Sequence, residues 1–369
     1  MRLPIALLAV LGLVLVACGG GNKTSSTATP GSSTSTTASA PAAKTVTSFA
    51  PAGASTFHVH AGVTDGVFDI EQFMPATVRI RQGDTIEWTA QGFEGHTVTF
   101  FPDGKLNIGQ SDYLVPAPDM PGAKEFNQVY ALGSDNQGTY DGTQYTNSGF
   151  LGVPAPGDYS ITFTAPGIYS YLCMIHPLNM RGVVVVEKAN TQVPSQQMLD
   201  EEAARLKQQF VQEAKDTAAA AQAERQAQNN AGGGNVWQVS AGLDTPHAQV
   251  LGFTPGALEI KAGDRVTFWN SDCDFHNVVF APKGTSPPAF PIIKPVAGKT
   301  GFRLIINPAA EKEVDPPAGF GLLAQFSSGI MGIGFPRFYY DVAFTKPGTY
   351  QYYCTIHVLA GMAGTITVK

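Results

Sequence analysis

The sequence has little charge, few cysteines and only one long apolar run. Charged residues make up 14% of the 369 residues, against about a quarter in a typical soluble protein. The 29 acidic and 23 basic residues give a formal net charge of −6, and a mildly acidic chain without basic runs is a poor nucleic-acid binder. Four cysteines are too few for a disulfide scaffold. A single apolar run, at the N-terminus, excludes a protein with several membrane spans.

What the chain does contain favours β-structure. Hydrophobic residues make up 43% of the sequence, which is enough for each domain to bury a core. The 40 glycines and 26 prolines favour turns and short strands over helices. The length allows two or three domains of ordinary size.

The N-terminus is typical of a targeting segment. Arg2 precedes an apolar run over residues 5–16, which is short for a membrane span and suits a signal peptide. Residues 15–19 read Leu-Val-Ala-Cys-Gly, which resembles the lipobox of bacterial lipoproteins. That resemblance implies a lipoprotein signal peptide over residues 1–18, with Cys18 lipidated after cleavage. The alternative is ordinary cleavage near Ala17.

The next segment, residues 19–53, is a predicted tether. It is rich in Ser, Thr, Ala, Gly and Pro, and such a segment cannot bury enough apolar surface to fold. We therefore expect the mature protein to lie outside the cytoplasmic membrane, in the periplasm or at the cell surface, held by its lipid anchor.

The rest of the chain is a tandem repeat. Residues 73–98 and 253–278 share Phe-x-Pro, Gly-Asp, an aromatic residue and His-x-Val, and residues 165–176 match residues 346–357. The offset between matching positions is nearly constant and far longer than a solenoid repeat, which indicates a duplicated domain. The predicted domains are residues 54–188 (domain 1) and 235–369 (domain 2).

Each domain shows the period-two pattern of strands. Apolar residues alternate with polar ones on both sides of the turns at Gly83-Asp84 and Gly263-Asp264. Both domains end in β-branched runs. Several short strands with regular turn signals predict an all-β chain with a β-sandwich in each domain. A Gly- and Pro-rich insertion interrupts each repeat, at about 102–150 and 281–336, and the sequence assigns neither a structure.

The segment between the domains, residues 189–234, breaks this pattern. Over residues 197–228 the apolar positions recur at helical spacing among Glu, Gln, Lys and Ala, which predicts an amphipathic helix. We interpret it as a strut that packs on one domain. A dimerisation helix is the alternative, which would make oligomers possible through this segment.

Domain 2 carries a set of metal-ligand residues. Cys354, His357 and Met362 form a C-x2-H-x4-M loop between two predicted strands, and His276 lies far upstream of the cysteine. A thiolate, two imidazoles and a weak thioether suit a copper electron-transfer site. Ligands held in a tight loop resist rearrangement between Cu(II) and Cu(I).

The loop and its flanking strands resemble the plastocyanin/azurin family, the cupredoxins. The similarity lies in residues 348–364, from Gly-Thr-Tyr to Met-Ala-Gly, and in His276-Asn277-Val278. It implies a Greek-key β-sandwich, a type 1 copper site and outer-sphere electron transfer. The implied ligands are His276, Cys354, His357 and Met362.

Domain 1 carries the equivalent residues with a shorter loop. His96 precedes Cys173, His176 and Met180, and the loop is C-x2-H-x3-M. Met180 remains the natural axial ligand, because Met180-Arg-Gly aligns with Met362-Ala-Gly. The chain is thus expected to bind two copper ions, one type 1 copper in each domain. The alternative is that domain 1 is a degenerate copy kept for packing.

Three further histidines and one cysteine are left over. His58 and His60 form an H-x-H pair, a motif that multicopper oxidases use for additional copper. Neither copper-loop cysteine has an adjacent histidine, which disfavours multicopper oxidases and copper nitrite reductases. With His247, the three remaining histidines are too few for a trinuclear centre, and a type 2 site assembled by an oligomer is the alternative. Cys273 is interpreted as a buried free thiol, with a redox-sensing role as the alternative.

Together these features predict an electron carrier and not an enzyme. We expect an extracytoplasmic blue-copper protein that transfers electrons between envelope redox proteins, attached to the membrane only through its lipid anchor. The first alternative is a two-domain copper oxidase or nitrite reductase-like enzyme with an additional type 2 copper site. The second is a copper storage or delivery protein.

Overall fold

The computed structural model describes residues 49–50, 52–102, 114–134, 138–152, 157–231, 236–281, 290–296, 301–332 and 335–369. Cys18, the signal peptide and nearly all of the predicted tether lie outside the described residues. None of the helices in the described ranges is long and apolar enough to cross a membrane.

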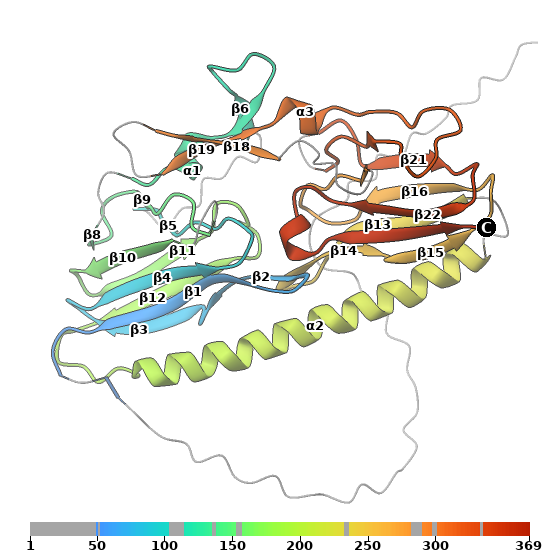
Figure 1. Ribbon diagram of the computed structural model, residues 1–369. Helices are drawn as coiled ribbons and strands as arrows, with labels where there is room; N and C mark the ends of the chain where they lie inside the picture. Colours follow the sequence, from blue (N-terminus) through green and yellow to red (C-terminus); the bar gives the residue numbers. More distant parts are fainter. Residues whose placement is uncertain are drawn as a thin grey trace, which may run out of the picture. The chain divides into compact units, whose positions relative to one another are not determined.

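Both repeats fold as strands, and a single long helix joins them (Figure 1). Domain 1 contains β1 (Thr56–Asp65), β2 (Phe68–Met74), β3 (Thr77–Arg81), β4 (Thr85–Gln91), β5 (Thr99–Phe100), β6 (Leu114–Pro116), β7 (Lys124–Phe126), α1 (Gln128–Ala131), β8 (Gly138–Tyr140), β9 (Thr146–Asn147), β10 (Asp158–Phe163), β11 (Gly167–Leu172) and β12 (Arg181–Glu187). The connecting helix is α2 (Gln196–Ala231). Domain 2 contains β13 (Val236–Asp244), β14 (Ala248–Thr254), β15 (Ala257–Ile260), β16 (Arg265–Asn270), β17 (Val279–Phe280), β18 (Pro291–Pro295), β19 (Phe302–Ile306), α3 (Pro308–Glu311), β20 (Phe326–Ser327), β21 (Tyr339–Ala343), β22 (Gly348–Tyr353), η2 (Val358–Ala360) and β23 (Ala363–Val368).

Each domain is a β-sandwich, as the sequence predicts. In domain 1, one layer is formed by β2, β1, β4, β10 and β8, and the other has the order β3-β12-β11-β5-β9. The alternating residues of β3 and β4 supply its core, because Val78, Ile80, Ile86 and Trp88 are all fully buried. Domain 2 repeats the arrangement with β21-β16-β13-β14 against β15-β23-β22-β17-β20. The all-β fold class is therefore confirmed.

The two domains join through an antiparallel strand pair. β2 of domain 1 pairs with β14 of domain 2, with Asp69 opposite Gln249 at the centre. These two residues occupy equivalent positions in the two repeats. The pairing is thus the kind that a two-fold axis produces between identical subunits, here within one chain.

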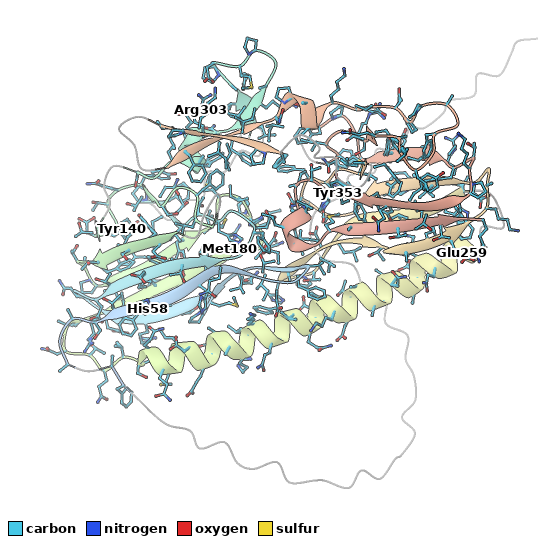
Figure 2. All side chains as sticks on the ribbon, viewed as in Figure 1. His58, Tyr140, Met180, Glu259, Arg303 and Tyr353 are labelled. Carbon is cyan, nitrogen blue, oxygen red and sulfur yellow. The ribbon has the colours of Figure 1, made fainter. Side chains whose placement is uncertain are left out.

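The insertions, which the sequence left without an assigned structure, form a second junction. Their strands make a small sheet with the order β18-β19-β7-β6, in which β19 pairs with β7. Arg303 of β19 forms ion pairs with Asp119 and Glu125 of domain 1. Lys124 reaches Glu311 of domain 2 at 3.1 Å. Figure 2 places Arg303 in this sheet, apart from Met180 in the domain 1 sandwich. Both insertions therefore cross-link the domains.

Helix α2 packs on both domains, not on one as predicted. Its buried residues Ala203, Phe210, Val211 and Ala214 share a core cluster with residues of β1, β2 and β14. The apolar stripe of the helix is therefore covered by strands of its own chain. An oligomer formed through this helix stays a prediction.

Candidate metal centres

Domain 2 brings its predicted cysteine and histidines together in a buried site. Cys354 Sγ lies 4.0 Å from His276 Nδ1 and 3.7 Å from His357 Nδ1, and the two Nδ1 atoms are 3.0 Å apart. All three side chains are at most 1% exposed. Cys354 follows the end of β22, His276 precedes β17, and His357 precedes η2, so loops at one end of the sandwich build the site.

Domain 1 builds the same arrangement. Cys173 Sγ lies 4.0 Å from His96 Nδ1 and 3.9 Å from His176 Nδ1, and the two nitrogens are 3.2 Å apart. Cys173 and His96 are buried, and the His176 side chain is 12% exposed. The domain 1 residues therefore form a group that could hold a metal ion, as those of domain 2 do.

In each set, the distances between the ligand atoms suit one metal ion. Tetrahedral coordination with metal–nitrogen bonds of about 2.0 Å and metal–sulfur bonds of about 2.3 Å separates two nitrogens by about 3.3 Å and nitrogen from sulfur by about 3.5 Å. The observed separations are within about half an ångström of these values. In both sets the Nδ1 atoms converge and the Nε2 atoms point away.

The predicted methionines close the two ligand loops in the same way. The backbone N–H of Cys173 donates to the carbonyl of Met180 at 3.0 Å, and that of Cys354 donates to Met362 at 3.0 Å. Both methionines are fully buried. The additional residue of the domain 2 loop is taken up next to η2, where Gly361 has a φ of 92°, a conformation that favours glycine. The shorter loop of domain 1 therefore keeps the same closing hydrogen bond.

The residue after the first histidine connects the two ligand loops in each domain. Asn277 exchanges two hydrogen bonds with Thr355, at 2.7 and 2.8 Å, and Thr97 accepts one from the backbone N–H of Met174 at 2.8 Å. The backbone N–H groups of Thr97 and Asn277 also donate to the cysteine sulfurs, at 3.3 and 3.5 Å. These contacts hold both loops in place before any metal binds.

A glycine bulge, which the sequence reasoning missed, makes room for the first histidine of each set. Gly62 (φ 76°) and Gly242 (φ 74°) lie where the strand register shifts in β1 and β13. A Cβ at Gly62 would lie 2.0 Å from His96 Nε2, and one at Gly242 would lie 2.3 Å from His276 Nε2. The bulge could have been predicted from the Ala-Gly pair that recurs at equivalent positions of the two repeats.

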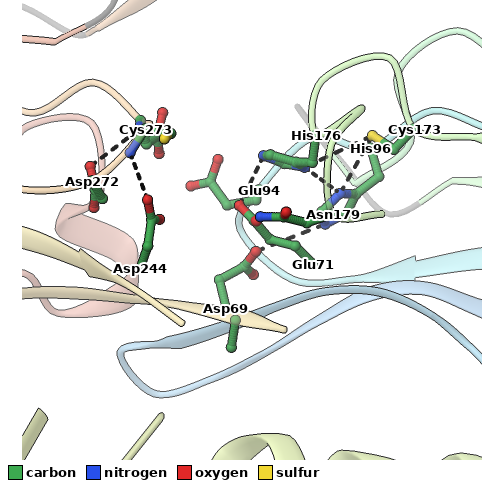
Figure 3. A network of polar contacts seen from close by, with 12 residues as sticks. Asp69, Glu71, Glu94, His96, Cys173, His176, Asn179, Asp244, Asp272 and Cys273 are labelled. Carbon is green, nitrogen blue, oxygen red and sulfur yellow. Dashed lines mark hydrogen bonds and ion pairs between the residues drawn. The ribbon is translucent and has the colours of Figure 1, made fainter. Parts of the chain in front are cut away.

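Carboxylates face the Nε2 atoms of all four histidines, and Figure 3 shows those around the domain 1 set. In domain 1, His176 Nε2 lies 3.2 Å from Glu71, and His96 Nε2 lies 4.0 Å from Asp69. In domain 2, His276 Nε2 is 2.8 Å from Asp272. His357 Nε2 lies 3.1 Å from Asp274 and 3.2 Å from Glu94, which belongs to domain 1. Sequence reasoning identified none of these acids.

The acids give the two sites different electrostatics. Burial raises the pKa of the Cys173 thiol to about 11. Burial also opposes ionisation of Cys354, but the charge of His357 and hydrogen bonds with His276 and His357 lower its pKa to about 6. Burial lowers the pKa of His276, and Asp272 more than reverses this, raising it to about 10. Before metal binding, the thiolate is therefore favoured in domain 2 and the neutral thiol in domain 1.

The remaining histidines join neither set. His58 Nδ1 contacts Glu87 at 3.0 Å, and its backbone N–H donates to Gln196 of α2. His247 contacts Glu213 of α2 at 3.0 Å and stacks on Phe210.

His60 lies half-buried on β1. Among the described residues, none of these three histidines belongs to a cluster that could hold a metal ion. Cys273 is partly exposed and disulfide-bonded, which corrects the interpretation of a buried free thiol.

Comparisons with known proteins agree with this geometry. The family described as copper binding proteins, plastocyanin/azurin family, matches residues 57–187 and 239–369. Plastocyanin from Prochlorothrix hollandica is 33% identical over 119 residues, which are 32% of this chain and 63% of that protein. The chain thus spans a little under two thirds of that relative's length. Plastocyanin A'/A'' from Nicotiana tabacum is 29% identical over 119 residues, covering 32% of this chain and 89% of that protein.

Solved structures with similarity to the chain include a plastocyanin and an amicyanin. Oxidised plastocyanin from Dryopteris crassirhizoma is 24% identical, covers 36% of this chain and 99% of its own, and has a TM-score of 0.22. A reduced mutant of amicyanin is 20% identical, covers 37% of this chain and 83% of its own, and has a TM-score of 0.22.

Proposed function

Because the chain belongs to the plastocyanin/azurin family of copper-binding proteins, we propose that it is an electron carrier with two type 1 copper sites. The proposed ligands are His96, Cys173, His176 and Met180 in domain 1, and His276, Cys354, His357 and Met362 in domain 2. The observation that carries the proposal is that each domain gathers one sulfur and two Nδ1 atoms within 4.0 Å of one another. Copper, when bound, supplies a reversible one-electron couple.

The protein's own part is to hold the ligands still and exclude water. The hydrogen bonds of Thr97 and Asn277 hold both loops before metal binds. Burial of both cysteines keeps the thiolates away from solvent. A preformed, dry ligand set changes little between the two charge states, which suits electron transfer and disfavours ligand exchange.

The two ligand sets are joined by a short path. Glu94 is two residues before His96 in the chain, and its carboxylate lies 3.2 Å from His357 Nε2. This contact supports exchange of electrons between the two sites inside one molecule, so that one chain serves two envelope redox proteins. We also propose that its partners are envelope redox proteins and that it is not an enzyme. Among the described residues, His58, His60 and His247 belong to no cluster that could hold a metal ion, which supports a carrier over an oxidase with an additional type 2 copper.

We expect two coppers per chain and an intense visible band that reductant bleaches, because each domain offers one thiolate to one metal. The measurement is copper content together with the visible spectrum, on protein that begins after Cys18. One copper with the band would mean that one domain has lost its metal. Additional copper without added blue intensity, together with a type 2 spin-resonance signal, would indicate the enzyme. Rapid loss of copper to a chelator would indicate storage or delivery.

The proposed location is extracytoplasmic, through a lipid on Cys18. This location is supported by the sequence of residues 15–19. Cys18 itself lies outside the described residues. We expect Cys18→Ala to move the protein from the membrane fraction to the soluble fraction. Copper content serves as the control, since the ligand sets do not include this residue. Unchanged fractionation of Cys18→Ala would refute the anchor and leave the copper sites untouched.

A further inference from the structure

The first histidine of domain 2 has a carboxylate partner that its domain 1 counterpart lacks. His276 Nε2 lies 3.0 and 2.8 Å from the two carboxylate oxygens of Asp272, which is within hydrogen-bond distance. Both side chains are 0% exposed, so water does not compete for this hydrogen bond. Asp272 lies four residues before His276, in the loop that follows β16. The loop that supplies the first ligand of domain 2 therefore also supplies the partner of that ligand.

The position equivalent to Asp272 in domain 1 is a glycine. Gly92 lies four residues before His96 and has no side chain that could reach the ring. The carboxylate that faces His96 Nε2 is that of Asp69, at 4.0 Å, which is too far for a hydrogen bond. Among the described residues, His96 Nε2 has no hydrogen-bond partner. The two first histidines therefore differ in one interaction, although their Nδ1 atoms are placed alike.

The backbone around Asp272 holds its carboxylate in place. Oδ1 of Asp272 accepts a hydrogen bond from the backbone N–H of Asp274 at 3.1 Å. The backbone N–H of Asp272 donates to the side chain of Asn270 at 3.3 Å. A Cβ at Gly242 would lie 1.7 Å from Asp272 Oδ2 and 2.3 Å from His276 Nε2, so the glycine bulge of β13 lies against both partners. The carboxylate is therefore fixed against the ring before any metal binds.

We propose that Asp272 is a positioning residue that orients His276 for copper and lowers the reduction potential of the domain 2 site. The inference rests on the proposed function, because it requires copper on Nδ1 of His276. A neutral imidazole that binds a metal through Nδ1 carries its proton on Nε2, and Asp272 accepts the hydrogen bond of that N–H group. A carboxylate in this position fixes the tautomer and the ring orientation and makes the imidazole a more basic ligand. A basic ligand beside a buried negative charge favours Cu(II) over Cu(I), because Cu(II) carries the larger positive charge.

The test is Asp272→Asn in a full-length chain that also carries Cys173→Ser, so that only domain 2 contributes a visible band. Asparagine keeps the size of the side chain and one acceptor oxygen, but it removes the charge. We expect Cu(II) binding to weaken by about tenfold, measured by competition with a chelator. Cu(I) has one positive charge fewer and should lose less affinity. The reduction potential should therefore rise, by at most about 59 mV for a tenfold loss, which a redox titration of the visible band measures.

Glu259→Gln in the same Cys173→Ser chain is the matched control. Glu259 lies on β15 of the same domain, is 63% exposed and pairs with Lys369. Neutralising it should leave the Cu(II) affinity and the reduction potential unchanged. Circular dichroism shows whether each variant keeps its β-sheet. A merely structural Asp272 would lower the stability of the metal-free chain without moving the reduction potential, and that result would overturn the proposal.

A measurement on the native chain does not depend on how the variant folds. In the reduced, copper-loaded chain with isotope-labelled histidine, nuclear magnetic resonance should detect a His276 Nε2 proton shifted downfield by its hydrogen bond to a carboxylate. The proton on His96 Nε2 should lack this shift, because His96 has no such partner. Equal shifts for the two protons would contradict the proposal.

The visible band separates this inference from the proposed function. If Asp272→Asn keeps the band together with the Cu(II) affinity and the reduction potential of the Cys173→Ser chain, the role of Asp272 is refuted and the carrier stands. If the Cys173→Ser chain itself shows no visible band after copper loading, the proposed function fails for domain 2.

Discussion

Replacing Cys354 with serine is expected to remove the visible copper band of domain 2 and to leave that of domain 1. The band requires a thiolate bound to copper, and a serine hydroxyl cannot replace it as a soft ligand. About half of the blue intensity of the chain should therefore disappear, because each domain supplies one thiolate. The measurement is the visible spectrum of copper-loaded protein, with copper content determined on the same sample.

The reciprocal change provides the control. Cys173→Ser should remove the other half of the intensity, and the double variant should be colourless while keeping its β-sheet circular dichroism. A Cys354→Ser protein with an unchanged spectrum would mean that domain 2 does not bind copper through this thiolate. The assignment of His276, His357 and Met362 would then fail with it.

The second large effect is expected from adding one methyl group at Gly62. The new Cβ would lie 2.0 Å from His96 Nε2, so the imidazole has to leave its position beside Cys173. The left-handed backbone adds about 1–2 kcal/mol of strain. We expect Gly62→Ala to lose the copper of domain 1 while domain 2 keeps its band, which metal content and the visible spectrum would reveal.

Gly66 offers a closely matched control for the strain. Its φ of 65° is similar to the 76° of Gly62, and a Cβ at Gly66 meets nothing within 4 Å. Gly66→Ala should therefore share the loss of stability but keep both copper bands. Equal copper loss in the two variants would show that backbone strain, and not displacement of His96, is responsible.

The ligand sets could be predicted from the sequence because their determinants are local or repeated. A Cys-x-x-His loop between two strands brings its residues to one point whatever surrounds it. His96 and His276 were found because they occupy equivalent positions in the two repeats. The sandwich core followed from alternation, and the structure buries Val78, Ile80 and their counterparts as expected.

The acids around the ligands could not be predicted in the same way. On β2, Asp69 and Glu71 alternate with Phe68 and Ile70, a pattern that reads as a polar face toward water. The structure leaves these acids 0% and 2% exposed, because they face His96 and His176 of the ligand set and β14 of the other domain pairs with the edge of their strand. Only the tertiary pairing turns a solvent face into an interior. The repeat shows that Glu94 and Asp274 occupy equivalent positions, but this equivalence alone did not indicate that they contact a ligand histidine.

The insertions escaped prediction for a related reason. Each supplies short strands, such as β7 and β19, that cannot form a stable sheet alone. They pair with each other across the two domains, and local propensity contains no information on such a partner. The sequence therefore assigned neither half of this sheet a structure.

The central pairing of Asp69 with Gln249 has a consequence for how the two halves can change. In a dimer of separate chains, this contact would be lost on dilution, and both partners would carry the same residue. Because both domains belong to one chain, each is held near the other at a fixed, high effective concentration. The contact therefore forms at any protein concentration. Substitutions can also accumulate on one side only. An acid faces a neutral amide at the centre of this pairing, an asymmetry that a homodimer encoded by one sequence cannot have.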